Sequence, residues 1–94
     1  MQITNVIWLP SVIEKLEWKH RVRMREVEEV LASANRFKFA ERGQHQDEHV
    51  YVAFGQTDDG RYLAVWFIYK STHEALVLSA RDVDDKERKQ YAKK

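Results

Sequence analysis

The sequence predicts an α+β fold in which helices pack on an antiparallel sheet, and three of its features support this prediction. Apolar residues recur every three to four positions across residues 24–34, which is the period of an amphipathic helix. From Arg36 onward the apolar residues alternate with a period of two, which is the period of a strand. The run Thr57-Asp58-Asp59-Gly60 then separates two strand-like segments, as the turn of a β-hairpin does.

A short strand and a first helix are predicted near the amino terminus. Residues 3–9 contain an apolar run ahead of the only proline in the chain, which favours a strand. Ser11 follows this proline and Glu14 stands three residues later, which is the spacing of a capping box at the start of a helix. We expect this helix to continue through His20.

A second, amphipathic helix is predicted over residues 24–34. One of its faces is charged, and the other carries the apolar residues Met24, Val27, Val30, Leu31 and Ala34. Because a one-sided helix has to bury its apolar face, we expect Val27, Val30 and Leu31 to pack on the strand predicted over residues 62–69.

Four strands and a closing helix are predicted in the remainder of the chain. The strands cover residues 37–40, 50–54, 62–69 and 75–80. The third is apolar on both faces, which predicts a central strand, whereas the first is predicted at an edge. Asp82 or Asp84 can cap a last helix that runs through Tyr91.

Length and composition limit the classes of protein that the chain can represent. Its 94 residues, 44% of them hydrophobic and 33% charged, suit one folded domain over residues 1–94. The chain has no cysteine, no secretory signal pattern and no apolar run long enough to cross a bilayer. We therefore expect a cytoplasmic protein without disulfides and without a membrane partner.

The formal charge of the chain is nearly balanced, with 16 basic and 15 acidic residues and a net charge of +1. A generic nucleic-acid-binding protein carries more positive charge, so any affinity for RNA has to come from local clusters. The clearest cluster is the run Lys19-His20-Arg21-Val22-Arg23-Met24-Arg25, which combines cations with a titratable histidine.

Short motifs follow one another in a recognisable order along the chain. The first are Trp8 ahead of a helix and then Lys19-His20-Arg21-Val22. The later ones are Gly55, Gly60-Arg61, Leu78-Ser79-Ala80-Arg81, and Glu87-Arg88 with Tyr91. In order and spacing, and over most of the chain, they resemble the BrnT-type toxins, small ribonucleases of the RelE-like group in bacterial toxin–antitoxin systems.

The resemblance implies a RelE-like fold, with two helices before an antiparallel sheet and a short helix near the end. It implies a metal-independent ribonuclease toxin of a type II toxin–antitoxin system, which inhibits translation by cleaving RNA and needs no cofactor. A cognate antitoxin with a ribbon-helix-helix DNA-binding region would neutralise it, and operator DNA would be reached only through that antitoxin. The alternatives are a non-enzymatic interaction module with the same fold and a regulator that acts in complex with the DNA-binding antitoxin.

Three residues at the motifs are candidates for catalysis. A metal-free ribonuclease needs a group that moves protons at the 2′-hydroxyl and the leaving 5′-oxygen, and cations that stabilise the reacting phosphate. His20 can be the acid or the base near neutral pH, and Arg61 and Arg81 can clamp the phosphate with paired hydrogen bonds. We expect these three side chains to converge on one concave surface.

Each catalytic candidate also has a structural alternative. His20 can interact with the terminal carbonyl groups of its helix. Arg81 can form an ion pair with Asp82, Asp84 or Glu87. Arg61 can be an ordinary residue at the exit of a hairpin.

Three further residues are predicted to bind the substrate. Lys19 and Arg23 add positive charge on either side of His20. Tyr91 can stack on a base or position the phosphate, and its alternative is to pack its ring against the sheet.

Two local features differ from the family or from the predicted elements. The family has glycine after Lys-His, which permits a positive φ, so Arg21 implies either a different corner or a strain of roughly 1 kcal/mol. The run His45-Gln46-Asp47-Glu48-His49 matches the H-x-x-E-H zinc-protease pattern, but that pattern needs a helix and a strand follows directly here. We expect a loop at this run and no metal.

Overall fold

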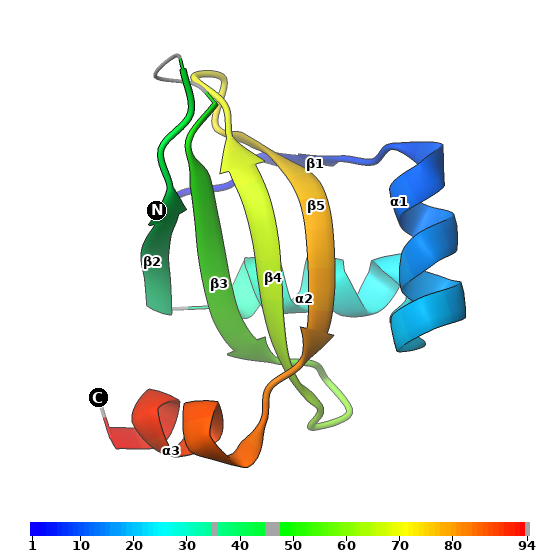
Figure 1. Ribbon diagram of the computed structural model, residues 1–94, viewed down its shortest axis with the longest axis vertical. Helices are drawn as coiled ribbons and strands as arrows, with labels where there is room; N and C mark the ends of the chain where they lie inside the picture. The colour runs from blue at the N-terminus through cyan, green and yellow to red at the C-terminus, as the bar shows by residue number, and fades with distance from the viewer. Residues whose placement is uncertain (35, 45–47, 94) are drawn as a thin grey trace.

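The described residues form a five-stranded sheet with helices on one face, at one edge and at one end (Figure 1). The computed structural model describes residues 1–34, 36–44 and 48–93, and in the last helix it describes side chains as far as Lys89. In chain order the elements are β1 (Asn5–Ile7), α1 (Pro10–Lys15), η1 (Leu16–His20), α2 (Met24–Ser33), β2 (Arg36–Glu41), β3 (Val50–Gln56), β4 (Tyr62–Tyr69), β5 (Glu74–Asp82) and α3 (Asp85–Lys93).

The strands lie in the order β1-β5-β4-β3-β2. From β2 to β5 each strand pairs antiparallel with its neighbour in sequence, and β4 is central, as its two-sided apolar pattern predicts. The first strand is added to β5 in parallel, with Ile7 opposite Leu76. The predicted α+β architecture, with a short amino-terminal strand, two helices, a meander and a closing helix, is confirmed.

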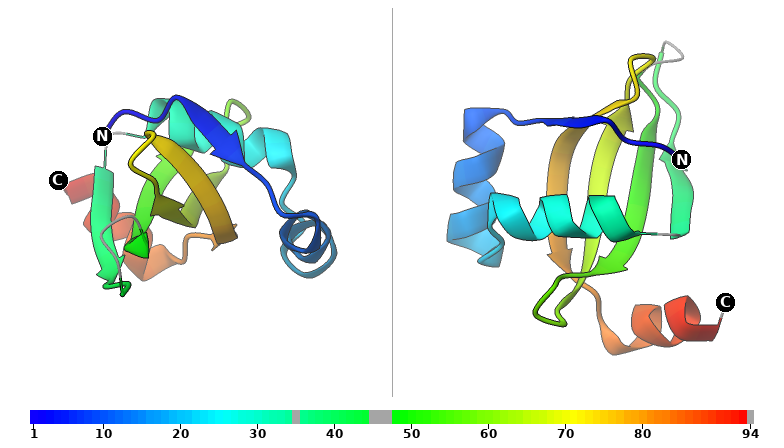
Figure 2. Two further views of the ribbon diagram at one scale, coloured as in Figure 1. Left: turned by 90° about the horizontal axis from the view of Figure 1, so that it is seen from above. Right: turned by 180° about the vertical axis from the view of Figure 1, so that it is seen from behind.

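The helices are distributed unequally around the sheet. α2 crosses one face, and α1 with η1 stands beside β5 (Figure 2). No helix of the described residues crosses the other face, which is toward the viewer in Figure 1, and α3 lies beyond one end of the strands. None of the described helices is long and apolar enough to span a membrane.

The core lies between α2 and the sheet. Val27, Val30 and Leu31 of α2 are buried, together with Phe67 of β4. Gly55 of β3 marks a close approach of the helix, because a Cβ atom there would lie 3.0 Å from Cγ1 of Val30. The predicted packing of the apolar face of α2 on the sheet is confirmed.

Val30→Ala should lower the free energy of unfolding by about 2 kcal/mol, because it removes buried methyl groups and leaves a cavity under α2. Val83→Ala is the matched control, since Val83 is half-buried and lies outside the core cluster. Val83→Ala should lower the free energy of unfolding by less than about 1 kcal/mol, as measured by urea unfolding followed by circular dichroism. Equal losses for the two variants would contradict this packing.

The first helix begins one residue before the predicted cap. Pro10 is its first residue, Leu9 is its N-cap, and none of the described side chains caps it. Proline suits the first helical position because its fixed φ is helical and its missing N–H would have no partner there. Ser11 therefore lies inside the first turn, and the predicted capping box with Glu14 is wrong.

The helix then widens into a π-helix, η1, and ends in a left-handed turn. The N–H groups of Arg21 and Val22 both bond to the carbonyl oxygen of Leu16. Arg21 has φ 55° and ψ 41°, the left-handed conformation that glycine adopts most readily. Of the two alternatives for Arg21, the structure shows the strained turn, at a cost of about 1 kcal/mol.

Arg21→Gly should raise the stability by up to about 1 kcal/mol, because glycine adopts a positive φ without the steric cost of a Cβ atom. Arg21→Ala removes the same charge but keeps the Cβ atom, so it should leave the melting temperature nearly unchanged. Differential scanning calorimetry compares the two variants. A glycine variant no more stable than the alanine variant would show that the turn carries no strain.

α3 begins at a capping box. Asp84 Oδ1 accepts a hydrogen bond from the N–H of Glu87 at 2.8 Å, and Glu87 Oε1 accepts one from the N–H of Asp84 at 3.2 Å. Of the two predicted caps Asp84 is therefore correct, whereas Asp82 is the last residue of β5.

Candidate functional site

The hairpin between β3 and β4 places Arg61 just ahead of the central strand. Gly60 has a φ of 94°, and its N–H bonds to the carbonyl oxygen of Thr57. The hydroxyl of Thr57, a buried residue, accepts a hydrogen bond from the N–H of Arg61 at 3.0 Å. The predicted turn is confirmed, and it fixes the backbone from which the Arg61 side chain extends.

Two carboxylates bind the Arg61 side chain. Nε and Nη2 donate to the two carboxylate oxygens of Asp82 at 2.7 and 3.1 Å. Nη1 donates to both carboxylate oxygens of Glu26, each at 3.2 Å. Because Asp82 ends β5 and Glu26 lies in the first turn of α2, one guanidinium connects the sheet to the helix.

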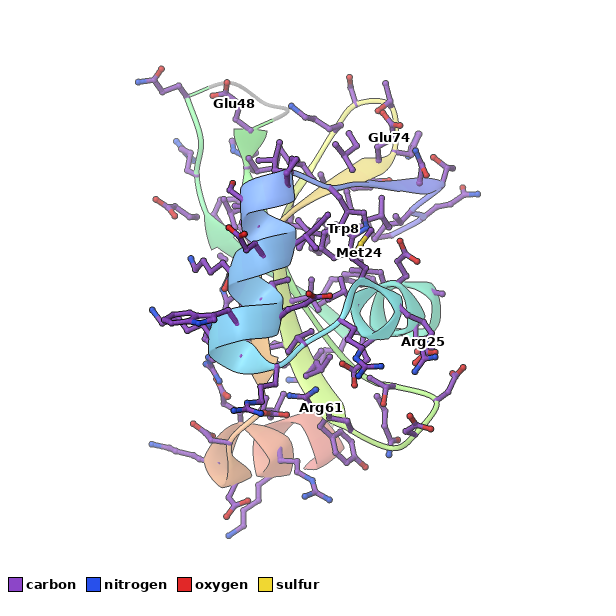
Figure 3. The ribbon with its side chains drawn as sticks, turned by 90° about the vertical axis from the view of Figure 1, so that its right-hand side faces the viewer. Trp8, Met24, Arg25, Glu48, Arg61 and Glu74 are labelled. Carbon is purple, nitrogen blue, oxygen red and sulfur yellow. The ribbon has the colours of Figure 1, made fainter. Side chains whose placement is uncertain are left out.

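The same guanidinium also caps the end of η1 (Figure 3). Nη1 donates to the carbonyl oxygen of Arg21 at 2.8 Å, and Nη2 donates to that of His20 at 3.2 Å. Carbonyl groups at a helix end have no partner within the helix, so these bonds satisfy them. A guanidinium has five N–H donors, and the contacts of Arg61 engage all of them.

The ion pair with Arg61 changes the acidity of Asp82. The hydrogen bond from Arg61 lowers the pKa of Asp82 below its ordinary value, burial opposes this shift, and the positive charges of Arg61 and His20 add to it. The hydrogen bond with Asp82 in turn raises the pKa of Arg61.

Arg81 lies on the opposite face of the sheet from the Arg61 ion pair. Arg81 is opposite Ala64 in the register, whereas Asp82 is opposite Leu63. Successive residues of a strand point to opposite faces, so the Asp82 side chain faces the helices and the Arg81 side chain faces the uncovered side.

The contacts of Arg81 attach α3 to that uncovered face. Nη1 and Nη2 donate to the two carboxylate oxygens of Glu87 at 2.9 and 2.8 Å. The hydrogen bond with Glu87 raises the pKa of Arg81. Its guanidinium carbon lies 5.0 Å from the centre of the Trp66 ring, and that of Arg88 lies 4.4 Å from the Tyr62 ring.

The structure therefore brings together two of the three predicted catalytic residues. The Arg61 side chain binds the backbone carbonyl group of His20 at the end of η1, whereas the Arg81 side chain lies on the other face of the sheet. The expectation that all three share one concave surface is wrong. The ion pair with Glu87 that was the structural alternative for Arg81 is present.

The predicted substrate-binding residues have different surroundings. Lys19 and Arg23 are exposed on either side of the half-buried His20, and neither enters an ion pair formed among the described residues. Arg23 lines a surface hollow of about 600 Å³ together with Glu17 and Arg21. Tyr91 belongs to α3, and its side chain lies outside the described residues.

The run of residues 45–49 that matches the zinc-protease pattern, and that was expected to form a loop, lies only partly within the described residues. His45 falls outside them, and Nδ1 of His49 accepts a hydrogen bond from the N–H of Gly43 at 3.0 Å. No group of three potential metal ligands occurs in the part of the chain that the structure describes.

The sequence matches the family model described as "Ribonuclease toxin, BrnT, of type II toxin-antitoxin system" over residues 12–87, most of the chain. The chain belongs to the BrnT family. Membership of a type II toxin family implies an antitoxin partner. The comparison with curated proteins gives no match.

Among solved structures, the BrnT ribonuclease toxin of Brucella abortus is similar to this chain with a TM-score of 0.59. The likeness covers 87% of this chain and 99% of that one, at 18% sequence identity. At this identity the comparison supports the fold alone, and it agrees with the α+β class predicted from the sequence.

Glu26 also belongs to the site of this BrnT-family chain, although none of the family-like motifs contains it. Its Oε1 atom accepts a hydrogen bond from the N–H of Arg23 at 3.0 Å, which is one half of a capping box at the start of α2. A local signal existed, because an acid in the first turn is typical of a helix start. The contact between Glu26 and Arg61, 35 residues apart, has no counterpart in local sequence rules.

Asp82→Asn should destabilise this BrnT-family protein at pH 7 and have a smaller effect in acid. A carboxyl whose pKa is lowered by folding contributes stability above its unfolded pKa, about 3.9, and loses it as pH falls through the folded value. The difference in urea midpoint between the wild type and Asp82→Asn should therefore shrink below about pH 4.

Asp59→Asn is the control for this measurement, because Asp59 lies in the exposed hairpin turn. Its midpoint should follow that of the wild type at pH 7 and at pH 3. A difference for Asp82→Asn that stays constant over this range would contradict the ion pair.

Proposed function

We propose that this BrnT-family chain is a metal-independent endoribonuclease that inhibits translation by cleaving RNA. The family supplies the class, a ribonuclease toxin of a type II system. The position of His20 indicates which residues would act on the RNA. It lies at the end of η1 with its carbonyl group held by Arg61, and the exposed cations Lys19 and Arg23 lie on either side.

RNA is cleaved without a metal when the 2′-hydroxyl attacks the adjacent phosphorus and the bond to the 5′-oxygen breaks. A base takes the proton of the 2′-hydroxyl, and an acid gives a proton to the leaving 5′-oxygen. We assign one of these transfers to His20, whose imidazole can act in either direction near neutral pH.

In this proposal Arg61 is a positioning residue. Its donors are engaged by Asp82, Glu26 and two backbone carbonyl groups, so it has none left for a phosphate. Its bond to the His20 carbonyl oxygen fixes the backbone that carries the imidazole. Lys19 and Arg23 are then the cations that contact the phosphates beside His20.

Arg81 is proposed to bind a phosphate on the uncovered face of the sheet, where the RNA replaces Glu87. Arg81 is 38% exposed at its side chain, so a phosphate can approach its guanidinium without displacing the core. Tyr91, which lies on α3 together with Glu87, is proposed to contact the same stretch of RNA.

We further propose that a cognate antitoxin neutralises the protein in the cytoplasm. A segment with acidic and apolar residues could cover the cations around His20 and fold as it binds. The antitoxin would carry a ribbon-helix-helix region, and the toxin would reach operator DNA only through it.

A second candidate is a non-enzymatic module that binds an antitoxin but cleaves nothing. One observation favours it: carboxylates engage both of the arginines predicted to clamp a phosphate. A protein that binds its antitoxin but leaves RNA intact, with or without Mg²⁺, would support this candidate and contradict the first.

His20→Ala should lower the rate of RNA cleavage at least 100-fold, as loss of a general acid or base does. Its melting temperature should change little, because the carbonyl group that Arg61 binds is retained. Arg61→Ala, by contrast, should lower both the stability and the rate. The assay is cleavage of a purified transcript in EDTA, and full activity of the His20 variant would exclude this site.

Arg81→Ala and Glu87→Gln form a matched pair for the uncovered face. Both remove the same ion pair, but only the first removes a group that can bind phosphate. We expect Arg81→Ala to lose cleavage and Glu87→Gln to keep it. Equal losses of activity and stability in the two variants would assign Arg81 to the structural ion pair.

A further inference from the structure

Trp18 is unusually exposed for a tryptophan. Its relative solvent exposure is 81%, although tryptophan side chains are on average well buried. It lies in η1 and lines a surface hollow of about 520 Å³ with Ser11, Glu14, Lys15 and Lys19. An indole ring held open on a helix, with lysines beside it, is available to stack on a flat partner.

The cations around Trp18 differ from three arginines elsewhere in the chain that form ion pairs. Ion pairs among the described residues engage Arg25, Arg61 and Arg81. None of these pairs engages the cations of η1 and its flanks, which are Lys15, Lys19, Arg21 and Arg23. Only Glu14 and Glu17 are acidic among the residues that line the two hollows of this region. The surface therefore keeps an excess of positive charge that the fold does not use.

We propose that Trp18 and these four cations form a binding platform for single-stranded RNA. A base can stack on the indole ring while the flanking ammonium and guanidinium groups contact phosphates, a combination typical of single-strand binding. Charge complementarity favours RNA as the occupant, since each nucleotide brings one phosphate to a surface of unpaired cations. The inference rests on the proposed function only in taking RNA as the ligand.

The platform shares Lys19 and Arg23 with the candidate active site and extends that site to Trp18, Lys15 and Arg21. Trp18 and His20 are two residues apart in η1, so their side chains lie on different sides of the helix, Trp18 exposed and His20 half-buried. An RNA strand stacked on Trp18 has to pass Lys19 and Arg21, around the end of the helix, to reach His20. Trp18 therefore adds affinity for strands of several nucleotides and contributes nothing to a dinucleotide.

The first test measures binding without cleavage. The probe is a fluorescein-labelled 2′-O-methyl oligo(A) 12-mer, which has no free 2′-hydroxyl and so cannot be cut by the proposed reaction. We expect Trp18→Ala to weaken binding on the order of tenfold in fluorescence anisotropy, and Trp18→Phe to weaken it less because a ring remains. The control is Phe39→Ala, since Phe39 is also exposed but lies on β2 at the far edge of the sheet.

The second test measures the contribution of charge. Lys15→Gln and Lys19→Gln should each reduce the slope of log affinity against log salt by about 0.7, as expected for one single-strand phosphate contact. Lys38→Gln on β2 should leave the slope unchanged. Unchanged slopes for the first two variants would remove these lysines from the platform.

The outcomes separate the platform from the proposed function. If Trp18→Ala binds the 12-mer as well as the wild type does, the platform is excluded, even if RNA cleavage by His20 is found. If Trp18→Ala weakens binding of the antitoxin and not of the 12-mer, the surface is a protein interface and the proposal is overturned. If the wild type binds through Trp18 but cuts no RNA, the platform stands and the proposed catalysis fails.

Discussion

The guanidinium of Arg61 joins three parts of the chain that come from distant positions. The end of η1 offers carbonyl groups without helical partners, the first turn of α2 offers Glu26, and the end of β5 offers Asp82. A planar group with five donors in fixed directions can bind all three, which a lysine ammonium cannot do. The placement of His20 depends on this contact, because Arg61 holds its carbonyl oxygen.

Local rules predicted most of the fold because most of its elements are specified locally. The spacing of Val27, Val30 and Leu31 is sufficient to identify α2 and its buried face, and the hairpin turn is fixed by Gly60. Ser11 considered as a cap predicts the start of α1 one residue too late, because Pro10 has a stronger preference for the first helical position. The parallel addition of β1 to β5 has no local signal at all.

The candidate site could be predicted only in part, because the face on which a side chain lies depends on strand pairing. Arg81 and Asp82 are neighbours in sequence, yet one faces the uncovered side and the other pairs with Arg61 beneath the helices. An irregularity in the pairing of β4 with β5, between Trp66 and Phe67, also shifts the alternation along the strand. A single sequence shows that these residues are present but not which of them meet.

Positive charge is distributed unevenly over the protein, although its net charge is only +1. Carboxylates that belong to the fold surround Arg61 and Arg81, so these arginines contribute little to the field outside the protein. The unpaired cations beside η1 remain to attract an anionic polymer over a distance. A nearly neutral chain can thus present one strongly basic region.

The pairing of β1 with β5 affects when the protein can fold during its synthesis. Thr4 bonds to His73 and Asn5 to Glu74, contacts that span 69 residues. β1 is therefore synthesised well before its partner β5, and such long-range closure is slow. Arg81 and Asp82 lie at the end of the same late strand, so a growing chain of this toxin family carries no complete site until its fold can close.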